Sequence, residues 1–369
     1  MINIYYGSNK YFNREIEELI KGCPVNTLSN LLDEMAVQVH RVEGIEKEGA
    51  TIRTINHLVI GSDEYSRLSD SGFNSFRTVL LRYKIKNLYV QNPPQKIQSI
   101  LKERKEHEVN FFNQKYNKFN LANLDEFRTT FDDYILGQSQ VQKELTRGLY
   151  RVAKGYNKDK PLVILFYGPT GVGKTETANF LSKISGEKLF RKQFSMYQTA
   201  AFSDFLFGSS HASGSFAQEL LERESNIILL DEFDKGNSMF YSAFYQIFDE
   251  GIFTDKNYSV HLENSIIICT SNFLDENHIR DVLGDPIYNR FDMTLKFSEL
   301  SEESTKQIIE QIYNKLISDL DDDDKEILTI NNCLGKLLSI SSMLKNVRAI
   351  KRVVNDAVIE MILQKKKLN

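Results

Sequence analysis

The chain has 369 residues, of which 41% are hydrophobic and 26% charged, and its formal net charge is −4. This length allows two or three domains with full cores, and the balanced charge argues against a nucleic-acid coat or a membrane-surface protein. The three cysteines, Cys23, Cys269 and Cys333, form no CxxC pair, which excludes a disulfide scaffold and a cysteine zinc site. No apolar run approaches the ~18 residues of a transmembrane helix, and no signal-peptide pattern is present. We therefore expect a soluble, cytoplasmic, multidomain protein.

Residues 1–118 are predicted to form a small α/β domain of unknown role with a helical connector. Ile2–Tyr6 alternates like a short strand, and His57–Gly61 and Asn87–Gln91 are apolar runs of strand length. Ser75–Tyr83 lies between the last two and has helical spacing, so the β-α-β order favours a parallel pair of strands. The connector is Gln95–His107, which is expected to be a charged helix.

Residues 119–299 are predicted to form a larger α/β domain. Three continuous apolar runs, Pro161–Phe166, Ile227–Leu230 and Ser265–Cys269, are bounded by glycines or acids and separated by helical segments. Runs of this kind are typical of strands that are buried on both faces of a parallel sheet. We expect the functional residues to lie at the carboxyl edge of this sheet.

Residues 300–369 are predicted to form a mostly helical subdomain. Glu302–Ile317 and Val347–Leu363 have the apolar periodicity of amphipathic helices. Ile327–Ile330 could form one short strand, and the acidic run Asp319–Asp324 is expected to be a solvated loop.

A phosphate-binding loop is predicted at residues 168–175, GPTGVGKT, which match the Walker A pattern GxxxxGK[ST] between an apolar strand and a helix. Glycines allow backbone N–H groups to curl around a phosphate, and the helix N-terminus adds its positive dipole. Lys174 is expected to reach the β- and γ-phosphate oxygens, and the Thr175 hydroxyl to bind Mg²⁺. The predicted nucleotide-binding residues of the loop are Gly168, Pro169, Thr170, Gly171, Val172, Gly173, Lys174, Thr175 and Glu176.

Polar residues follow two other predicted strands. Asp231 and Glu232 come directly after one apolar run, as in a Walker B motif, and Asn272 follows the next. Asp231 would hold Mg²⁺, mostly through water, and Glu232 would act as the general base for the attacking water. Asn272 would hold that water near the γ-phosphate. An apolar run that ends in two acids is a weak signal alone, but the phosphate loop makes the catalytic interpretation specific.

Six motifs in the same order resemble those of the Clp-type AAA+ ATPases, the protein unfoldases and disaggregases, over residues 124–363. The resemblance is closest to their second ATPase ring. It implies the AAA+ fold, a three-layer α/β P-loop sheet with a C-terminal helical lid. The motifs are ILGQ (135–138) with Val141, GPTGVGKTE (168–176), Ser195 with Tyr197, ILLDEFDK (228–235) with FDEGIFTD (248–255), NRFD (289–292) and NVRAIKR (346–352).

The resemblance also implies roles for residues outside the phosphate loop. Ile135 and Leu136 would pack against adenine. Arg290 would be an arginine finger that reaches the γ-phosphate of a neighbouring subunit, and Arg348 a sensor that touches nucleotide from the lid. The alternative for Arg290 is a surface ion pair with Asp292. The alternative for Arg348 is a place on the polar face of its helix. The implied assembly is a homo-oligomer, a hexameric ring or spiral, with ATP and Mg²⁺ as cofactors.

The chain departs from the family pattern in the segment that should grip substrate. The family's aromatic pore loop corresponds to residues 207–216 here, and no aromatic residue lies between Gly208 and Ser215. Threading of a polypeptide is therefore in doubt, because small side chains cannot wedge against a moving chain. Phe202, Phe205 and Phe207 have the spacing of a buried helix face. The tripeptide by which the family docks on its peptidase is also absent.

Three functions remain open at this point. The first is an ATP-driven remodelling enzyme that acts on a protein partner chosen by residues 1–118. The second is a nucleotide-gated assembly or signalling ATPase, as in bacterial defence, without processive unfolding. The third, a nucleic-acid motor, is disfavoured because Lys and Arg are not clustered outside the C-terminal tail and the helix at 95–107, which also carries acids.

Overall fold

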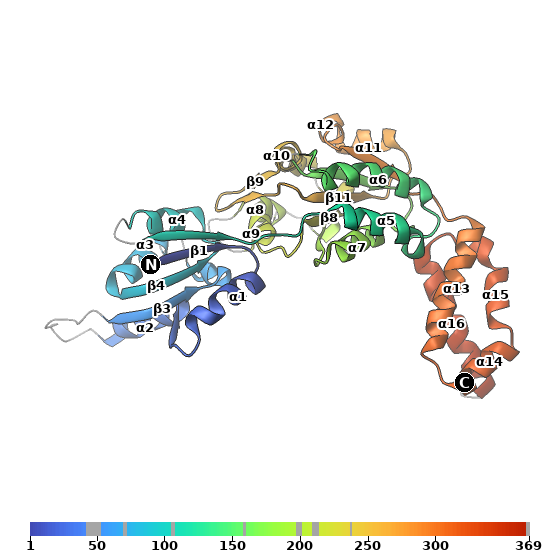
Figure 1. Cartoon of the computed structure of the whole chain (residues 1–369), viewed down its shortest axis with the longest axis horizontal. Helices are drawn as coiled ribbons and strands as arrows, with labels where there is room; N and C mark the ends of the chain where they lie inside the picture. The colour runs from blue at the N-terminus through green and yellow to red at the C-terminus, as the bar shows by residue number, and fades with distance from the viewer. Residues whose placement is uncertain are drawn as a thin grey trace. The chain divides into compact units, whose positions relative to one another are not determined.

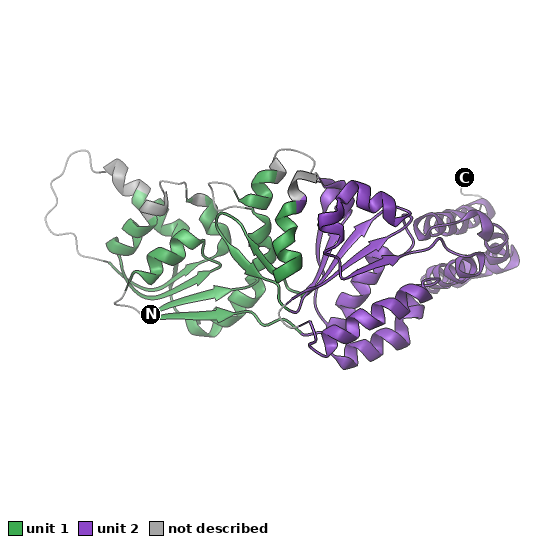
Figure 2. Ribbon diagram, turned by 90° about the horizontal axis from the view of Figure 1, so that it is seen from above, with its two compact units in different colours: residues 1–117, 197–226, 242–263 green, residues 118–196, 227–241, 264–369 purple. Residues whose placement is uncertain are grey.

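The computed structural model describes residues 1–41, 53–68, 72–104, 108–157, 160–196, 201–208, 214–236 and 238–366. The chain forms two compact units, one of residues 1–117, 197–226 and 242–263 and the other of residues 118–196, 227–241 and 264–369 (Figure 2). The division into 1–118, 119–299 and 300–369 remains a prediction, but the compact units do not follow it. Two segments from within 119–299 pack with the N-terminal residues.

The first unit is built on a five-stranded parallel sheet with strand order β2-β3-β4-β1-β5 (Figure 1). The predicted parallel β-α-β pair is confirmed, since β3 and β4 pair in parallel and α3 lies between them in the sequence. Ile4, Leu58 and Phe76 are fully buried in its larger core. The elements are β1 (Ile2–Tyr6), α1 (Asn9–Ile20), β2 (Val25–Thr27), α2 (Leu28–Arg41), β3 (Thr54–Ile60), a 3₁₀ helix η1 (Ser62–Arg67), α3 (Gly72–Arg82), β4 (Lys84–Gln91), α4 (Gln95–Lys102) and β5 (Val109–Asn113).

Protein segments cover the carboxyl edge of this first sheet. Ser62, which follows β3, donates its hydroxyl hydrogen to Glu222 Oε1 (2.5 Å). The backbone N–H of Gln95, which follows β4, donates to the carbonyl of Asn257 (2.8 Å). These contacts explain why residues 197–226 and 242–263 group with the N-terminal domain. The elements within these two segments are α8 (Ala201–Phe207), α9 (Phe216–Leu221), α10 (Tyr245–Glu250) and the antiparallel pair β9 (Ile252–Thr254) and β10 (Ser259–His261).

The second unit is built on another five-stranded parallel sheet, with order β12-β6-β11-β8-β7. The three predicted strands are confirmed as β6, β8 and β11, and every residue in them is buried, as expected for strands covered on both faces. The elements are α5 (Leu121–Tyr134), α6 (Ser139–Ala153), β6 (Leu162–Tyr167), α7 (Lys174–Ser185), β7 (Phe190–Gln193), β8 (Ile227–Asp231), β11 (Ile266–Ser271), α11 (Glu276–Leu283), α12 (Asp285–Tyr288) and β12 (Met293–Lys296).

A helical subdomain follows the second sheet in the same unit and has its own apolar core. It consists of α13 (Glu302–Ser318), α14 (Asp322–Ile330), α15 (Cys333–Ser339) and α16 (Val347–Lys366) (Figure 1). The predicted strand at 327–330 is wrong, because these residues form the end of α14. The acidic run is not wholly a loop either. The Asp321 carboxylate accepts from the N–H of Asp324 (2.8 Å) and caps α14, and the acids of the first turn complement the helix dipole.

The prediction that Phe202, Phe205 and Phe207 form a buried helix face is wrong for Phe207, which is 44% exposed. Phe205 is half-buried, and the side chain of Phe202 lies outside the described residues. Tyr197 and residues 209–213 of the predicted pore segment lie outside the described residues. Within the described part of the chain, no helix combines the length and apolar character needed to cross a bilayer.

Candidate nucleotide-binding site

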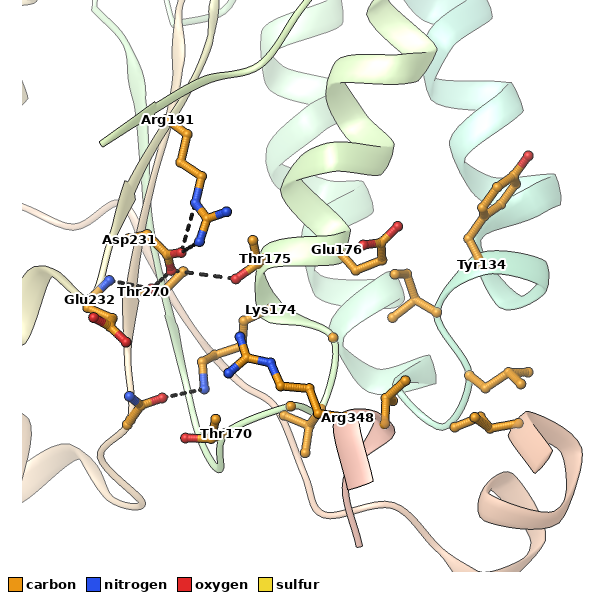
Figure 3. A pocket seen from close by; sticks show the side chains of 18 of the residues that line it. Tyr134, Thr170, Lys174, Thr175, Glu176, Arg191, Asp231, Glu232, Thr270 and Arg348 are labelled. Atoms are coloured by element: carbon orange, nitrogen blue, oxygen red, sulfur yellow. Dashed lines mark hydrogen bonds and ion pairs between the residues drawn. The ribbon is translucent and has the colours of Figure 1, made fainter. Parts of the chain in front are cut away.

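A pocket of about 520 Å³ lies at the carboxyl edge of the second sheet, where the phosphate loop follows β6 and where β8 and β11 end (Figure 3). Gly168, Pro169 and Arg290 are the predicted site residues that lie outside its lining. The predicted residues that the structure brings together in the pocket wall are Ile135, Leu136, Thr170, Gly171, Val172, Gly173, Lys174, Thr175, Glu176, Asp231, Glu232, Asn272 and Arg348.

The loop between β6 and α7 takes a conformation that depends on glycine. Gly168, Gly171 and Gly173 have φ angles of 133°, 78° and 109°, in the region that favours glycine. A Cβ at Gly168 would lie 2.2 Å from the backbone oxygen of Phe297, so a larger residue does not fit. Because α7 begins at Lys174, its first N–H groups and its positive dipole end lie at the pocket.

Lys174 lies at the floor of the phosphate end and is 7% exposed. Its ammonium donates to the carbonyls of Gly168 (2.6 Å) and Pro169 (2.8 Å) and to Asn272 Oδ1 (3.1 Å). Burial lowers the pKa of Lys174 to about 8. The lysine is thus held between the loop and the end of β11 (Figure 3), as expected for a residue that must face phosphate oxygens.

Asp231 ends β8 and engages both of its carboxylate oxygens. Oδ1 accepts from the hydroxyls of Thr270 (2.6 Å) and Thr175 (3.5 Å). Oδ2 accepts from Arg191, through Nη2 (2.5 Å) and Nε (3.1 Å). The Asp231 side chain is 8% exposed, so these partners determine its position.

Glu232 is held in a left-handed backbone conformation with a φ of 54°, which is uncommon outside glycine. Its N–H donates to the Thr270 hydroxyl (2.8 Å), and its Oε2 accepts from the Gln193 side chain (3.1 Å). Hydrogen bonds from Ser195 and then from Gln193 lower the pKa of the Glu232 carboxyl. The carboxylate is therefore ionised at neutral pH and can accept a proton.

The other end of the pocket is more apolar. Ile135 and Leu136 follow α5, and the lid contributes Ile308 and Ile312 from α13 and Val347 from α16. The N–H of Val347 donates to the carbonyl of Gly171 (2.9 Å), which ties the start of α16 to the phosphate loop. This end has the character that a nucleobase requires, since ligand sites combine apolar walls with a few polar groups.

Arg348 and Arg290 occupy different places. Arg348 follows Val347 on α16 and points toward Lys174 (Figure 3). Arg290 lies after α12, half-buried, and donates from Nη1 to the carbonyl of Pro286 (2.5 Å). Asp292 accepts from the N–H of Val163 (2.9 Å) and so anchors the segment to β6.

The oxygen donors at the phosphate end fit Mg²⁺. The carboxylate of Asp231 and the hydroxyl of Thr175 lie 3.5 Å apart, and Mg²⁺ prefers oxygen ligands. Among the described residues, no cluster of three or more His, Cys, Asp or Glu side chains could hold a metal ion. The pair of Asp231 and Thr175 nevertheless suits Mg²⁺ in a nucleotide site, because there the ion takes only one or two ligands from the protein and the others from water and phosphate oxygens.

Sequence reasoning missed five polar residues of the pocket wall, which are Tyr134, Arg191, Gln193, Thr270 and Gln311. Arg191 and Gln193 lie on β7, which pairs in parallel with β8 so that Gln193 is opposite Asp231. Nothing in the tetrapeptide FRKQ indicates this, because the position of β7 beside β8 is a tertiary feature. The alternation of the strand is the only local signal, since it places residues 191 and 193 on the same face.

A phosphate loop on a parallel α/β sheet, with a helical lid that completes the pocket wall, is the arrangement of the AAA+ class of P-loop domains. A profile described as AAA domain (Cdc48 subfamily) matches residues 159–321. These residues carry an AAA domain, and the predicted resemblance to the Clp-type AAA+ ATPases and the predicted fold class are confirmed.

Individual relatives agree with this assignment. The chain is 26% identical over 262 residues to the ATP-dependent Clp protease ATP-binding subunit ClpE of Lactococcus lactis subsp. lactis (strain IL1403), covering 62% of this chain and 35% of that protein. It is 29% identical over 201 residues to the chaperone protein ClpB of Chlamydia pneumoniae, covering 51% and 22%. It is 30% identical over 210 residues to the ClpL subunit of Staphylococcus aureus (strain USA300), covering 50% and 29%.

The match extends to only part of these relatives, since the chain spans about a quarter to a third of their length. Among solved structures, a cryo-EM reconstruction of closed-state Hsp104 with ATPγS and FITC casein is similar, with a TM-score of 0.55 and 16% identity. The alignment covers 99% of this chain and 88% of that chain. At this identity the similarity concerns the fold alone.

Proposed function

We propose that the chain binds ATP with Mg²⁺ in this pocket and hydrolyses it to ADP and phosphate. The observation that carries the proposal is the meeting of three separate strand ends at one pocket. Lys174 and Asn272 are hydrogen-bonded to each other (3.1 Å), and Asp231 and Glu232 are joined through the Thr270 hydroxyl.

Each group has a distinct task in this proposal. Glu232 takes the proton of the attacking water, and Asn272 orients that water. Lys174 and Arg348 place positive charge where the γ-phosphate develops negative charge. Bound Mg²⁺, held by Thr175 and Asp231, supplies charge neutralisation on the phosphates. Ile135, Leu136 and the apolar lid residues enclose the base.

Replacement of Lys174 by alanine is expected to weaken ATP binding about 10- to 100-fold, because charge-assisted hydrogen bonds to phosphate are lost. Titration with a fluorescent ATP analogue measures this change. The matched control is Lys325→Ala on α14, which removes a half-exposed lysine paired with Asp322 (3.7 Å) and should leave affinity unchanged. Equal affinity of the wild-type and Lys174→Ala proteins would contradict the site assignment.

We further propose that the chain works as a homo-oligomeric ring or spiral that remodels a protein partner. The names of two relatives support this, because one is a Clp protease ATP-binding subunit and the other is a chaperone. The position of Arg290 outside its own pocket also supports it, since a finger that serves a neighbouring subunit must lie outside the pocket of its own chain. Residues 1–118 would choose the partner.

Processive unfolding is expected to be weak or absent even where ATP hydrolysis is robust. The segment 208–215 offers only small side chains and His211, which cannot grip a moving chain as an aromatic residue does. The assay follows the fluorescence of a tagged, folded reporter protein with ATP in excess. Complete ATP-dependent loss of fluorescence would refute this prediction. No loss, together with ATP-driven changes in assembly size, would support a nucleotide-gated assembly.

A further inference from the structure

Arg191 is a charged residue in the pocket wall, and it has no role in the proposed reaction. It lies on β7, lines the pocket, and its side chain is 44% exposed. Its guanidinium contacts a single oxygen, Asp231 Oδ2, through both Nη2 (2.5 Å) and Nε (3.1 Å). Charge-assisted contacts of this length are among the stronger hydrogen bonds of proteins.

The two oxygens of Asp231 are not equivalent. Oδ1 accepts from two neutral hydroxyls, those of Thr270 and Thr175, and a hydroxyl oxygen can bind a cation while its hydrogen points elsewhere. Oδ2 is held by a full positive charge. A divalent cation that approaches this carboxylate therefore meets a cation already seated on one oxygen, and like charges so close repel each other.

The two partners also differ in freedom to move. The Asp231 side chain is 8% exposed and ends a buried strand, whereas Arg191 is 44% exposed. An arginine side chain of this exposure can move toward solvent on its flexible stem when another cation replaces its contact with Asp231, while the buried carboxylate stays held by its hydroxyl partners. Any rearrangement on ligand binding should thus occur at Arg191.

We propose that Arg191 is a positioning residue that neutralises and orients Asp231, and that it gives up this contact to Mg²⁺ when Mg·ATP binds. This inference rests on the proposed function, because it assumes that Asp231 serves Mg²⁺. The exchange makes Arg191 a competitor of Mg²⁺. Arg191 therefore reduces the difference in affinity between Mg·ATP and metal-free ATP. It also balances the negative charge of the buried Asp231 carboxylate before nucleotide binds.

The test compares the dissociation constant of a fluorescent, non-hydrolysable probe, the N-methylanthraniloyl derivative of β,γ-imido-ATP, in Mg²⁺ and in EDTA. The ratio of the EDTA constant to the Mg²⁺ constant measures how strongly the metal assists binding. In Arg191→Gln this ratio is expected to rise about 3- to 10-fold over wild type, because the competing charge is gone. In Arg191→Lys, which keeps the charge but loses the two-point contact, the rise should be smaller.

The matched control is Arg77→Gln, which removes a guanidinium paired with Glu103 at the same distance, 2.5 Å, in the other compact unit. It should leave the ratio at the wild-type value. A ratio that is unchanged or lower in both Arg191 variants would overturn the inference, since Arg191 would then be structural or would assist the metal. If the Arg191→Gln protein does not fold, the ratio of dissociation constants measured for Arg191→Lys is used to test the inference.

Failure of the proposed function would look different. A wild-type chain that binds the probe in neither buffer would overturn the nucleotide site and the inference with it. A wild-type chain that binds in both buffers, with variants of unchanged ratio, would overturn the role of Arg191 alone. Thermal melting of each variant separates a loss of fold from a loss of metal linkage.

Discussion

Replacement of Glu232 by glutamine is expected to slow ATP hydrolysis at least ~10²-fold, the scale of a general base, while ATP binding persists. The amide keeps the size and polarity of the side chain but cannot accept the proton of the attacking water. The surroundings of Glu232 make this test sharp, because its backbone bond to Thr270 does not depend on the side chain. The contact from Gln193 can be kept by an amide oxygen. The measurements are phosphate release and binding of a fluorescent ATP analogue.

The matched control for this prediction is Glu302→Gln. Glu302 lies at the start of α13 and pairs with Lys306 (2.6 Å) on an exposed helix surface, where such pairs contribute little. Its removal should change neither turnover nor affinity. Undiminished hydrolysis by the Glu232→Gln protein would show that the general base lies elsewhere.

Replacement of Arg290 by alanine is expected to cut turnover about 10³-fold, the lower end of the range for an arginine finger, with nucleotide affinity near normal. Within its own chain Arg290 lies outside the pocket lining and donates to the Pro286 carbonyl. In the proposed ring, Arg290 would complete the active site of a neighbouring subunit. Steady-state phosphate release, measured over a range of protein concentrations, is the relevant experiment.

Mixing the two variant proteins distinguishes an active site shared between subunits from a defect confined to one subunit. When Arg290→Ala is combined with Glu232→Gln, some interfaces regain both groups and part of the activity should return. The control is Arg280→Ala, which removes a neighbouring, half-exposed guanidinium paired with Asp285 (3.6 Å) and should not alter turnover. A specific activity that does not change between dilute monomers and concentrated samples would be incompatible with the interface model.

The phosphate end of the site could be predicted because its chemistry is local. Residues 168–175 form one continuous segment from the loop into the start of α7. This segment contains the glycines that the loop conformation requires, the first residue of the helix and the phosphate-binding lysine. Asp231, Glu232 and Asn272 were found for a related reason. Each follows an apolar run, and parallel strands buried on both faces all end at one edge of the sheet.

Sequence patterns predicted the wrong secondary structure where the same pattern is compatible with both a helix and a strand. Ile327–Ile330 are apolar enough for a strand, yet they end α14, which Asp321 caps and three acids in the first turn favour. Short apolar runs cannot distinguish a strand from a helix by periodicity alone. Phe207 was expected in a buried face but is 44% exposed, because a short helix buries only the side that its neighbours cover.

Sequence alone was enough to predict the class of fold and most of the residues that meet in the pocket wall, since the motifs that carry them are each made of residues close together in the chain. Tertiary structure decided the rest. The contacts of Arg191 with Asp231 and of Gln193 with Glu232 require β7 to pair with β8. The packing of residues 197–226 and 242–263 with residues 1–117 joins segments that begin 80 residues or more further along the chain (197 − 117 = 80). Contacts of this kind depend on the order of strands in a sheet and on which edge another segment covers, and neither is written in any single stretch of the chain.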